Sequence, residues 1–171
     1  MSRSFDFAEC EQITAGAVGE PGGRTFYLQA RTTFDVATLL VEKEQVRVLC
    51  EAMMRMLEQL PELDEGVAPE EWQLALQEPV EPEWRAGQMS IEYEEAIDRV
   101  VITIEEVEDE DAPEPPATAR FLATRAQARA MAEHALEVVE SGRPRCQLCG
   151  YPMDPEGHVC PAMNGFRSPR T

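Results

Sequence analysis

The chain has 171 residues, a formal charge of −18 at neutral pH and a 43% apolar fraction, which together suit one folded body with a hydrophobic core. Five cysteines are too few for a disulfide scaffold, and neither a signal-peptide core nor a membrane-spanning apolar stretch is present. We therefore expect a cytoplasmic protein with reduced thiols and no membrane contact.

The negative charge is concentrated in the middle of the chain. Residues 62–114 contain 19 Asp or Glu and only two Arg, a local net charge of −17, whereas arginines outnumber carboxylates after Ser141. Such a field repels phosphate backbones and anionic membranes, and it attracts cations. Solubility is the simplest reason for the acidity. A nucleic-acid role for the body is disfavoured, and another protein, of basic character, is the expected partner.

The first sixty residues predict three strands followed by a helix. The segments ITAGAV and RTFYLQA (24–30) flank EPGG (20–23), whose central Pro and Gly match a type II turn. The segment 35–42 reads as a third strand. Apolar residues in 46–60 then recur every three or four positions, which predicts an amphipathic helix that ends before Pro61. Cys50 lies on its apolar face and is interpreted as a buried, inert thiol.

A long acidic connection separates this part from a second group of elements. Within residues 61–83 we expect Trp72 to pack on the body, together with Leu74 or Leu76. Alternating apolar and polar residues in 84–107 predict two antiparallel strands. The acidic, proline-rich segment 108–118 reads as a loop.

A short strand, ARFLA, follows this loop and leads into a second amphipathic helix. A capping box of Thr124 and Gln127 opens the helix, and Gly142 ends it. Residues 40–53 and 122–135 also align without gaps, which suggests two β-β-α halves that share one sheet. The predicted fold is α+β, a mainly antiparallel sheet with two amphipathic helices.

The C-terminal part carries the clearest chemistry. Cys146, Cys149, His158 and Cys160 have the spacing Cys-x2-Cys-x8-His-x-Cys. Cys-x-x-Cys in a tight turn can chelate one ion, and two ligands two residues apart point the same way along an extended segment. Three thiolates and one imidazole suit tetrahedral Zn²⁺. His158 can instead only brace the loop, with Asp154 or water completing the ligand shell.

Two other interpretations of this stretch do not fit its context. A thioredoxin-like dithiol opens a helix after a strand, whereas Cys146 follows a helix and leads into turn residues. A zinc deaminase needs His-x-Glu and Pro-Cys-x-x-Cys, but His134 is followed by Ala135 and Leu136, and Arg145 precedes Cys146. The sequence therefore predicts a body at 1–142 and a small zinc knuckle or ribbon at 143–171.

The blocks SRSFDF, GEPGGRTFYLQA and CQLCGYPMDPEGHVCP, taken together, resemble an uncharacterised protein family found largely in actinobacteria. The resemblance extends from Ser2 to Phe166. It departs at Gln147, where the family usually has Pro, and at Ala162, where it usually has Arg. Because this family has no established activity, the resemblance implies the fold and the metal site but no mechanism.

The favoured function is a non-enzymatic zinc-binding protein that acts by binding another protein. One alternative is an enzyme with a pocket lined by Glu20, Arg24 and Gln29. A second is weak nucleic-acid binding through the zinc tail, as in zinc knuckles. No nucleophile or phosphate-loop motif occurs, and with two histidines the choice of general base is small.

Overall fold

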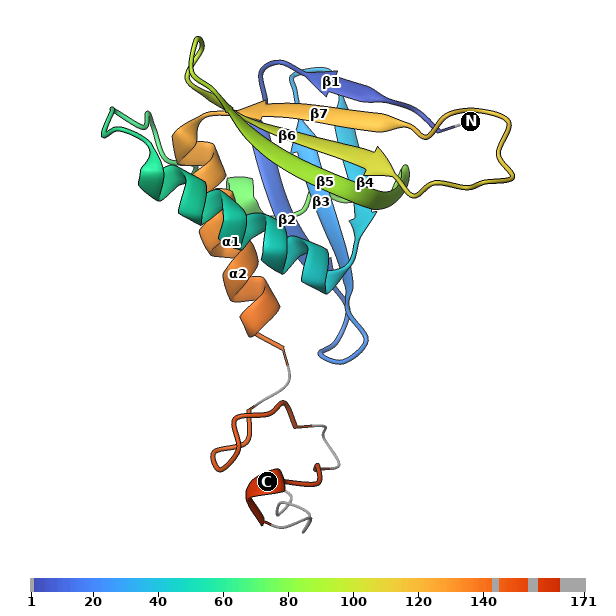
Figure 1. Cartoon of the computed structure of the whole chain (residues 1–171), viewed down its shortest axis with the longest axis vertical. Coiled ribbons are helices and arrows are strands. Elements are labelled where there is room, and N and C mark those ends of the chain that lie inside the picture. The colour runs from blue at the N-terminus through green and yellow to red at the C-terminus, as the bar shows by residue number, and fades with distance from the viewer. Residues whose placement is uncertain (1, 143–144, 154–156, 164–171) are drawn as a thin grey trace.

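The computed structural model describes residues 2–142, 145–153 and 157–163, and its described part forms a seven-stranded sheet with two long helices (Figure 1). This confirms the predicted α+β class. The elements in chain order are β1 (Phe5–Phe7), β2 (Gln12–Val18), β3 (Thr25–Arg31), β4 (Val36–Val41), α1 (Lys43–Gln59), the 3-10 helix η1 (Glu71–Leu74), β5 (Trp84–Glu94), β6 (Arg99–Glu106), β7 (Thr118–Ala123), α2 (Arg125–Glu140) and the 3-10 helix η2 (Pro161–Met163).

The sheet has the order β1-β7-β6-β5-β4-β3-β2 and is mainly antiparallel, as predicted. Two neighbouring pairs are parallel, β1 with β7 and β4 with β5. The two outermost strands, β1 and β2, are consecutive in the chain and only the four residues 8–11 separate them. The sheet must therefore curl until its two edges approach each other. Figure 1 shows this curvature, with α1 and α2 side by side against the body.

Local chemistry explains where the elements begin and turn. The turn between β2 and β3 is type II, since Gly22 has a φ of 94° and the Gly23 amide donates to the Glu20 carbonyl at 2.9 Å. The predicted capping box at Thr124 and Gln127 is present at the start of α2. An equivalent box at the start of α1 uses Glu42 in place of Thr.

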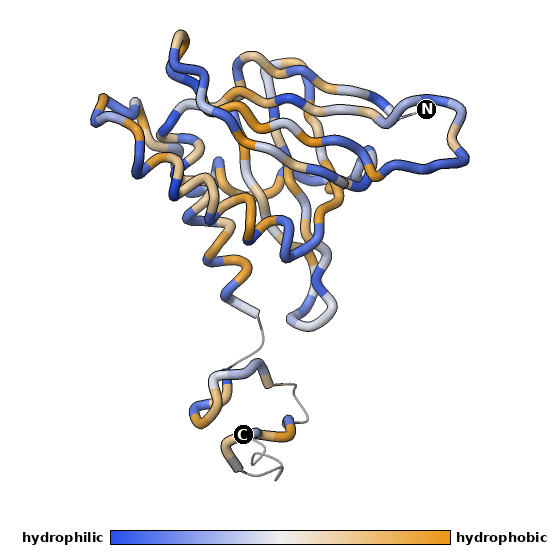
Figure 2. The backbone as a smooth tube through the Cα atoms, in the orientation of Figure 1, coloured by the Kyte–Doolittle hydropathy of each residue, from blue (hydrophilic) through white to orange (hydrophobic). Residues whose placement is uncertain are grey.

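The core lies between the sheet and one face of each helix. Five residues of α1 are buried, which confirms the predicted apolar face: Val46, Leu49, Cys50, Met53 and Leu57. Cys50 is fully buried, and this desolvation raises the pKa of its thiol to about 12, so it stays protonated and unreactive. Figure 2 shows the apolar positions gathered along the strands and helices, while the loop after β6 is mainly hydrophilic.

The prediction for Trp72 is wrong. Its side chain is 62% exposed, and its indole nitrogen donates to Glu70 at 2.8 Å. The segment around it is held through its backbone instead, because Thr14 on β2 donates to the Leu74 carbonyl and Gln12 donates to the Ala75 carbonyl. Buried polar side chains on a sheet face need such partners. The predicted packing of Leu74 or Leu76 is confirmed, because the partly buried Leu76 side chain lies over Gly16 of β2, 3.1 Å from where a Cβ atom would stand.

The two halves of the body are structurally equivalent over a strand, a cap and a helix. Val36 and Val41, which bound β4, lie 82 residues before Thr118 and Ala123, which bound β7, and the two helices begin with the same offset. The buried positions Val46, Leu49, Cys50, Met53 and Leu57 of α1 correspond one for one to Ala128, Met131, Ala132, Ala135 and Val139 of α2.

The equivalence extends beyond each helix. Gln45, the third residue of α1, donates to the carbonyls of Ala86 and Gly87 on β5, and its counterpart Gln127 donates to the carbonyl of Cys10 after β1. These partners are themselves related, because β5 pairs in parallel with β4 and β1 pairs in parallel with β7. The repeating unit is therefore three strands and a helix, one strand more than the sequence comparison predicts.

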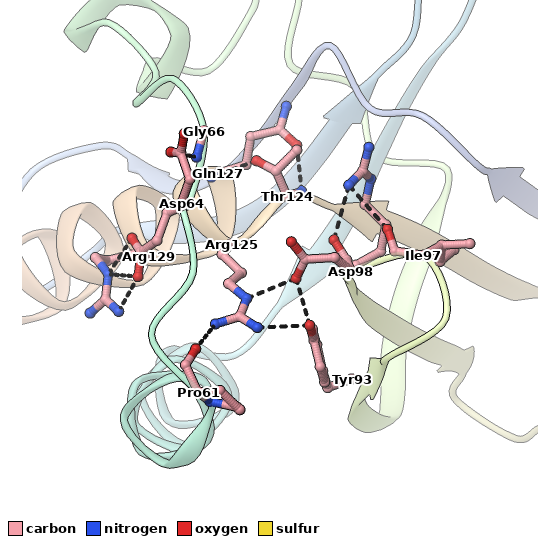
Figure 3. Close-up of polar contacts among 12 residues, drawn as sticks. Pro61, Asp64, Gly66, Tyr93, Ile97, Asp98, Thr124, Arg125, Gln127 and Arg129 are labelled. Atoms are coloured by element: carbon pink, nitrogen blue, oxygen red, sulfur yellow. Dashed lines mark hydrogen bonds and ion pairs between the residues drawn. The ribbon is translucent and has the colours of Figure 1, made fainter.

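A buried arginine joins the two halves (Figure 3). Arg125, the first residue of α2, has a side chain only 4% exposed. It donates to Asp98 at 2.8 Å, to the Tyr93 hydroxyl at 2.8 Å and to the Pro61 carbonyl at 2.6 Å. The Tyr93 hydroxyl donates in turn to Asp98 at 2.6 Å. These bonds tie the end of α1, the β5–β6 hairpin and the start of α2 together.

Candidate metal centre

The Cys-x-x-Cys stretch forms a tight turn. The Gly150 amide donates to the Cys146 carbonyl at 2.9 Å, and the Cys146 amide donates to the Tyr151 carbonyl at 2.8 Å. Gly150 has a φ of 76°, the left-handed region in which a side chain is strained. The glycine after the second cysteine thus lets the backbone curl back, which brings the Cys146 and Cys149 thiols together.

The chain then returns with the second pair of ligands. One ligand atom from each of Cys146, Cys149, His158 and Cys160 lies within 4.8 Å of all the others. The Cys146 and Cys160 sulfurs are 3.9 Å apart, and the Cys149 sulfur is 3.3 Å from Nε2 of His158. The structure therefore brings together all four residues that the sequence singles out.

These separations fit a tetrahedral metal ion. With Zn–S bonds of about 2.3 Å and Zn–N bonds of about 2.0 Å, tetrahedral geometry places two sulfurs about 3.8 Å apart and a sulfur and a nitrogen about 3.5 Å apart. Both distances quoted above are within a few tenths of an ångström of these values. The cluster can therefore hold a metal ion.

The four candidate ligands differ in how far they are exposed to solvent. Cys146 and Cys160 are buried, whereas Cys149 and His158 are partly exposed. Nδ1 of His158 is buried and has no hydrogen-bond partner within the described residues, although a metal-ligating histidine usually donates from its second nitrogen. Asp154, the other candidate for the fourth position, lies outside the described residues.

Three large apolar side chains close in sequence to the candidate ligands are exposed to solvent. Leu148, Tyr151 and Val159 are 63%, 60% and 60% exposed. Sequence reasoning based on ligand spacing missed them, although Leu148 and Val159 are adjacent to a candidate ligand and Tyr151 is two positions after Cys149.

The three residues of the alternative pocket are not brought together. Glu20 is exposed in the β2–β3 turn, and Gln29 is buried, donating to Thr38 at 2.9 Å and accepting from the Gln77 amide at 2.7 Å. Arg24 does line a half-open cleft, of about 500 Å³. Its charged companions there, Lys43 and Arg85, were missed because they stand 19 and 61 residues further along the chain.

Fold and site together define a class of protein: an acidic α+β body followed by a Cys3His cluster able to bind a metal ion. The chain matches the sequence family described as Protein of unknown function (DUF3090) over residues 5–160, and it belongs to that family. Neither the curated proteins nor the solved structures contain a match to it. Within the described residues, every helix is too short or too polar to cross a membrane.

Proposed function

We propose that this protein is a non-enzymatic zinc-binding protein of the cytoplasm that acts through contact with another protein. The observation that supports it best is the close approach of four ligand atoms, from Cys146, Cys149, His158 and Cys160, within 4.8 Å of one another. Three thiolates and an imidazole are the soft and borderline ligands that favour Zn²⁺ over Mg²⁺ or Ca²⁺, which prefer oxygen.

The role of the ion in this proposal is structural. Four protein ligands complete a tetrahedral shell, which leaves no coordination position for a substrate or a water molecule. Without a bound ion, no metal–ligand bonds would join the Cys-x-x-Cys turn to the segment that ends at Cys160. Zinc binding therefore supplies the free energy that orders the tail.

The tail is also the proposed contact surface. Leu148, Tyr151 and Val159 are all more than half exposed, and the metal would fix them relative to each other. Tyr and large aliphatic side chains of this kind form the anchors of protein interfaces. The acidic body favours a partner of basic character, since opposite charge speeds the encounter.

Metal analysis tests the first part of the proposal. The full chain, purified without added zinc, is expected to contain about one equivalent of zinc. Cys149→Ser should lose it, because a tetrahedral site is weakened severely when a thiolate is removed. Cys50→Ser is the matched control, since Cys50 lies in the core of the body. A Cys149→Ser protein that keeps a full equivalent would contradict the ligand assignment.

Site-specific crosslinking tests the second part. A photoreactive residue at Leu148 or Tyr151 should capture one discrete protein in cells, and a chelator should abolish the capture. The same residue at Val67, which is 93% exposed in the 61–70 connection, is the control. Equal crosslinking from Val67 and the tail, or none from either, would argue against the tail as an interface.

A further inference from the structure

The half-open cleft beside Arg24 gathers positive charge in a strongly acidic protein. The cleft has a volume of about 500 Å³ and lies where the β2–β3 turn, the start of α1 and the start of β5 meet the end of α2. Arg24, Lys43 and Arg85 line it, and Glu42 is the one carboxylate in its described wall. Three cations therefore face one space in a chain whose net charge is −18.

Arg24 is oriented by neutral groups. Its guanidinium donates to the Val138 carbonyl at 2.9 Å and to the Ser141 hydroxyl at 3.4 Å, and it lies 5.1 Å from the centre of the Phe26 ring. These contacts fix the direction of the side chain, and no carboxylate among the described residues pairs with it. A guanidinium positioned in this way is a usual means by which proteins bind phosphate or carboxylate groups.

Two of the cations, Arg24 and Lys43, lie close to Gly142. A Cβ atom at this position would lie 3.1 Å from Nη2 of Arg24 and 3.7 Å from Nζ of Lys43. Both charged groups thus approach the backbone of Gly142 closely, and the absence of a side chain there leaves room for the Arg24 guanidinium. Arg85, on the other wall, is 3.7 Å from Glu42, and both side chains are well exposed, so this ion pair is weak and easily exchanged for a better anion.

The second half of the body, from β5 to α2, shows which residues occupy the position equivalent to this cleft. Lys43, the first residue of α1, corresponds to Arg125, the first residue of α2. Arg125 is neutralised by Asp98, which comes from the β5–β6 hairpin. The equivalent β2–β3 hairpin contributes a second cation, Arg24, in place of a carboxylate. One half therefore places a carboxylate beside the first residue of its helix, whereas the other half places a second cation, Arg24, at the cleft.

From these observations we propose that the cleft binds a small phosphate-bearing molecule through Arg24, Lys43 and Arg85. Phosphate is favoured over a single carboxylate because it carries up to two charges and three acceptor oxygens, which suit a cleft lined by three cations. The volume falls within the usual range for small-molecule sites. This binding function is separate from the metal site and goes beyond the proposed protein contact.

Titration of the zinc-loaded full chain with inorganic phosphate and with pyrophosphate tests the proposal, by calorimetry at low ionic strength. Saturable binding is expected, with pyrophosphate tighter than phosphate, and added salt should weaken both. Arg24→Gln and Arg85→Gln should each weaken binding by about tenfold, because each removes a charge-assisted contact. Arg55→Gln, an exposed position on α1, is the charge-matched control and should change little.

A second variant protects the test against a folding defect. Gly142→Asp adds a carboxylate beside Arg24 and Lys43 and removes no cation. It should imitate Asp98 of the other half, occupy the cleft and compete with pyrophosphate. If the wild-type chain shows no saturable binding, or if Arg55→Gln weakens it as much as Arg24→Gln does, the proposal is wrong. Inorganic phosphate binding as tightly as pyrophosphate would identify free phosphate, not a phosphorylated metabolite, as the ligand.

Discussion

Replacing Tyr93 by Phe tests whether the buried arginine network stabilises the body. The change removes one oxygen and keeps the ring, whose centre lies 5.0 Å from the Arg125 guanidinium carbon. That oxygen accepts from Arg125 at 2.8 Å and donates to Asp98 at 2.6 Å. A buried donor of Arg125, whose side chain is 4% exposed, is then left without its acceptor.

The expected loss follows from these contacts. A hydrogen bond to a charged group contributes about 1.5–3 kcal/mol. Asp98 is 39% exposed, so water can replace part of what it loses. We therefore expect Tyr93→Phe to lower the free energy of unfolding by about 2 kcal/mol. With an m-value of about 2 kcal/mol/M, the urea midpoint should fall by about 1 M.

Tyr27→Phe provides the control. Tyr27 is a half-buried residue of β3, and its hydroxyl makes no hydrogen bond within the part of the chain that the structure describes. Its replacement should cost less than about 0.5 kcal/mol. If the two variants unfold at the same urea concentration, the network does not stabilise the body in the way described.

Further predictions concern pH, thiols and metal. Hydrogen bonds from Tyr93 and Arg125 lower the pKa of Asp98, and those from Arg129 lower the pKa of Glu65. The unfolded chain therefore binds more protons in acid, so the stability advantage of wild type over Tyr93→Phe should shrink between about pH 5 and pH 3 in urea titrations; an advantage that stays constant would contradict this. In the native, metal-loaded protein Cys10 and Cys50 should resist alkylation, since burial raises the pKa of both thiols to about 12; mass spectrometry that finds either one modified would refute their inertness. A chelator should leave the far-ultraviolet circular dichroism and the melting temperature of the body nearly unchanged, because the core cluster draws its residues from Phe5 to Val139; unfolding of the sheet on metal removal would show that the tail supports the body.

The sequence predicts most of the elements because their signals are local. The period-two pattern of β5 and β6, the glycine turn at Gly22 and the capping box at Thr124 each depend on residues close in the chain. The strand β1 was missed, since its three residues pair with β7 over a hundred positions later. The alternation of Phe5, Asp6 and Phe7 is too short to identify a strand by itself.

The same distinction separates the two sites. The metal ligands lie within fifteen residues, so their spacing predicts their convergence, and the structure brings all four together. The cleft draws Arg24, Lys43 and Arg85 from three different elements. Of these three residues the sequence analysis singles out only Arg24. It groups Arg24 with Gln29, whose side-chain amide instead bonds to Thr38 and Gln77. The prediction for Trp72 is wrong for a related reason, because backbone hydrogen bonds and the Leu76 side chain, not the indole, hold the segment on the sheet.

X-ray absorption spectroscopy at the zinc edge on the native, full-length protein tests the central claim most directly. The account predicts a four-coordinate ion with three sulfurs at about 2.3 Å and one nitrogen at about 2.0 Å. The His158→Ala variant should replace only the nitrogen with a light atom of solvent, because the three thiolates of Cys146, Cys149 and Cys160 remain. A shell made up mainly of oxygen or nitrogen, or one unchanged by Cys149→Ser, would contradict the assignment of this cluster as a zinc site.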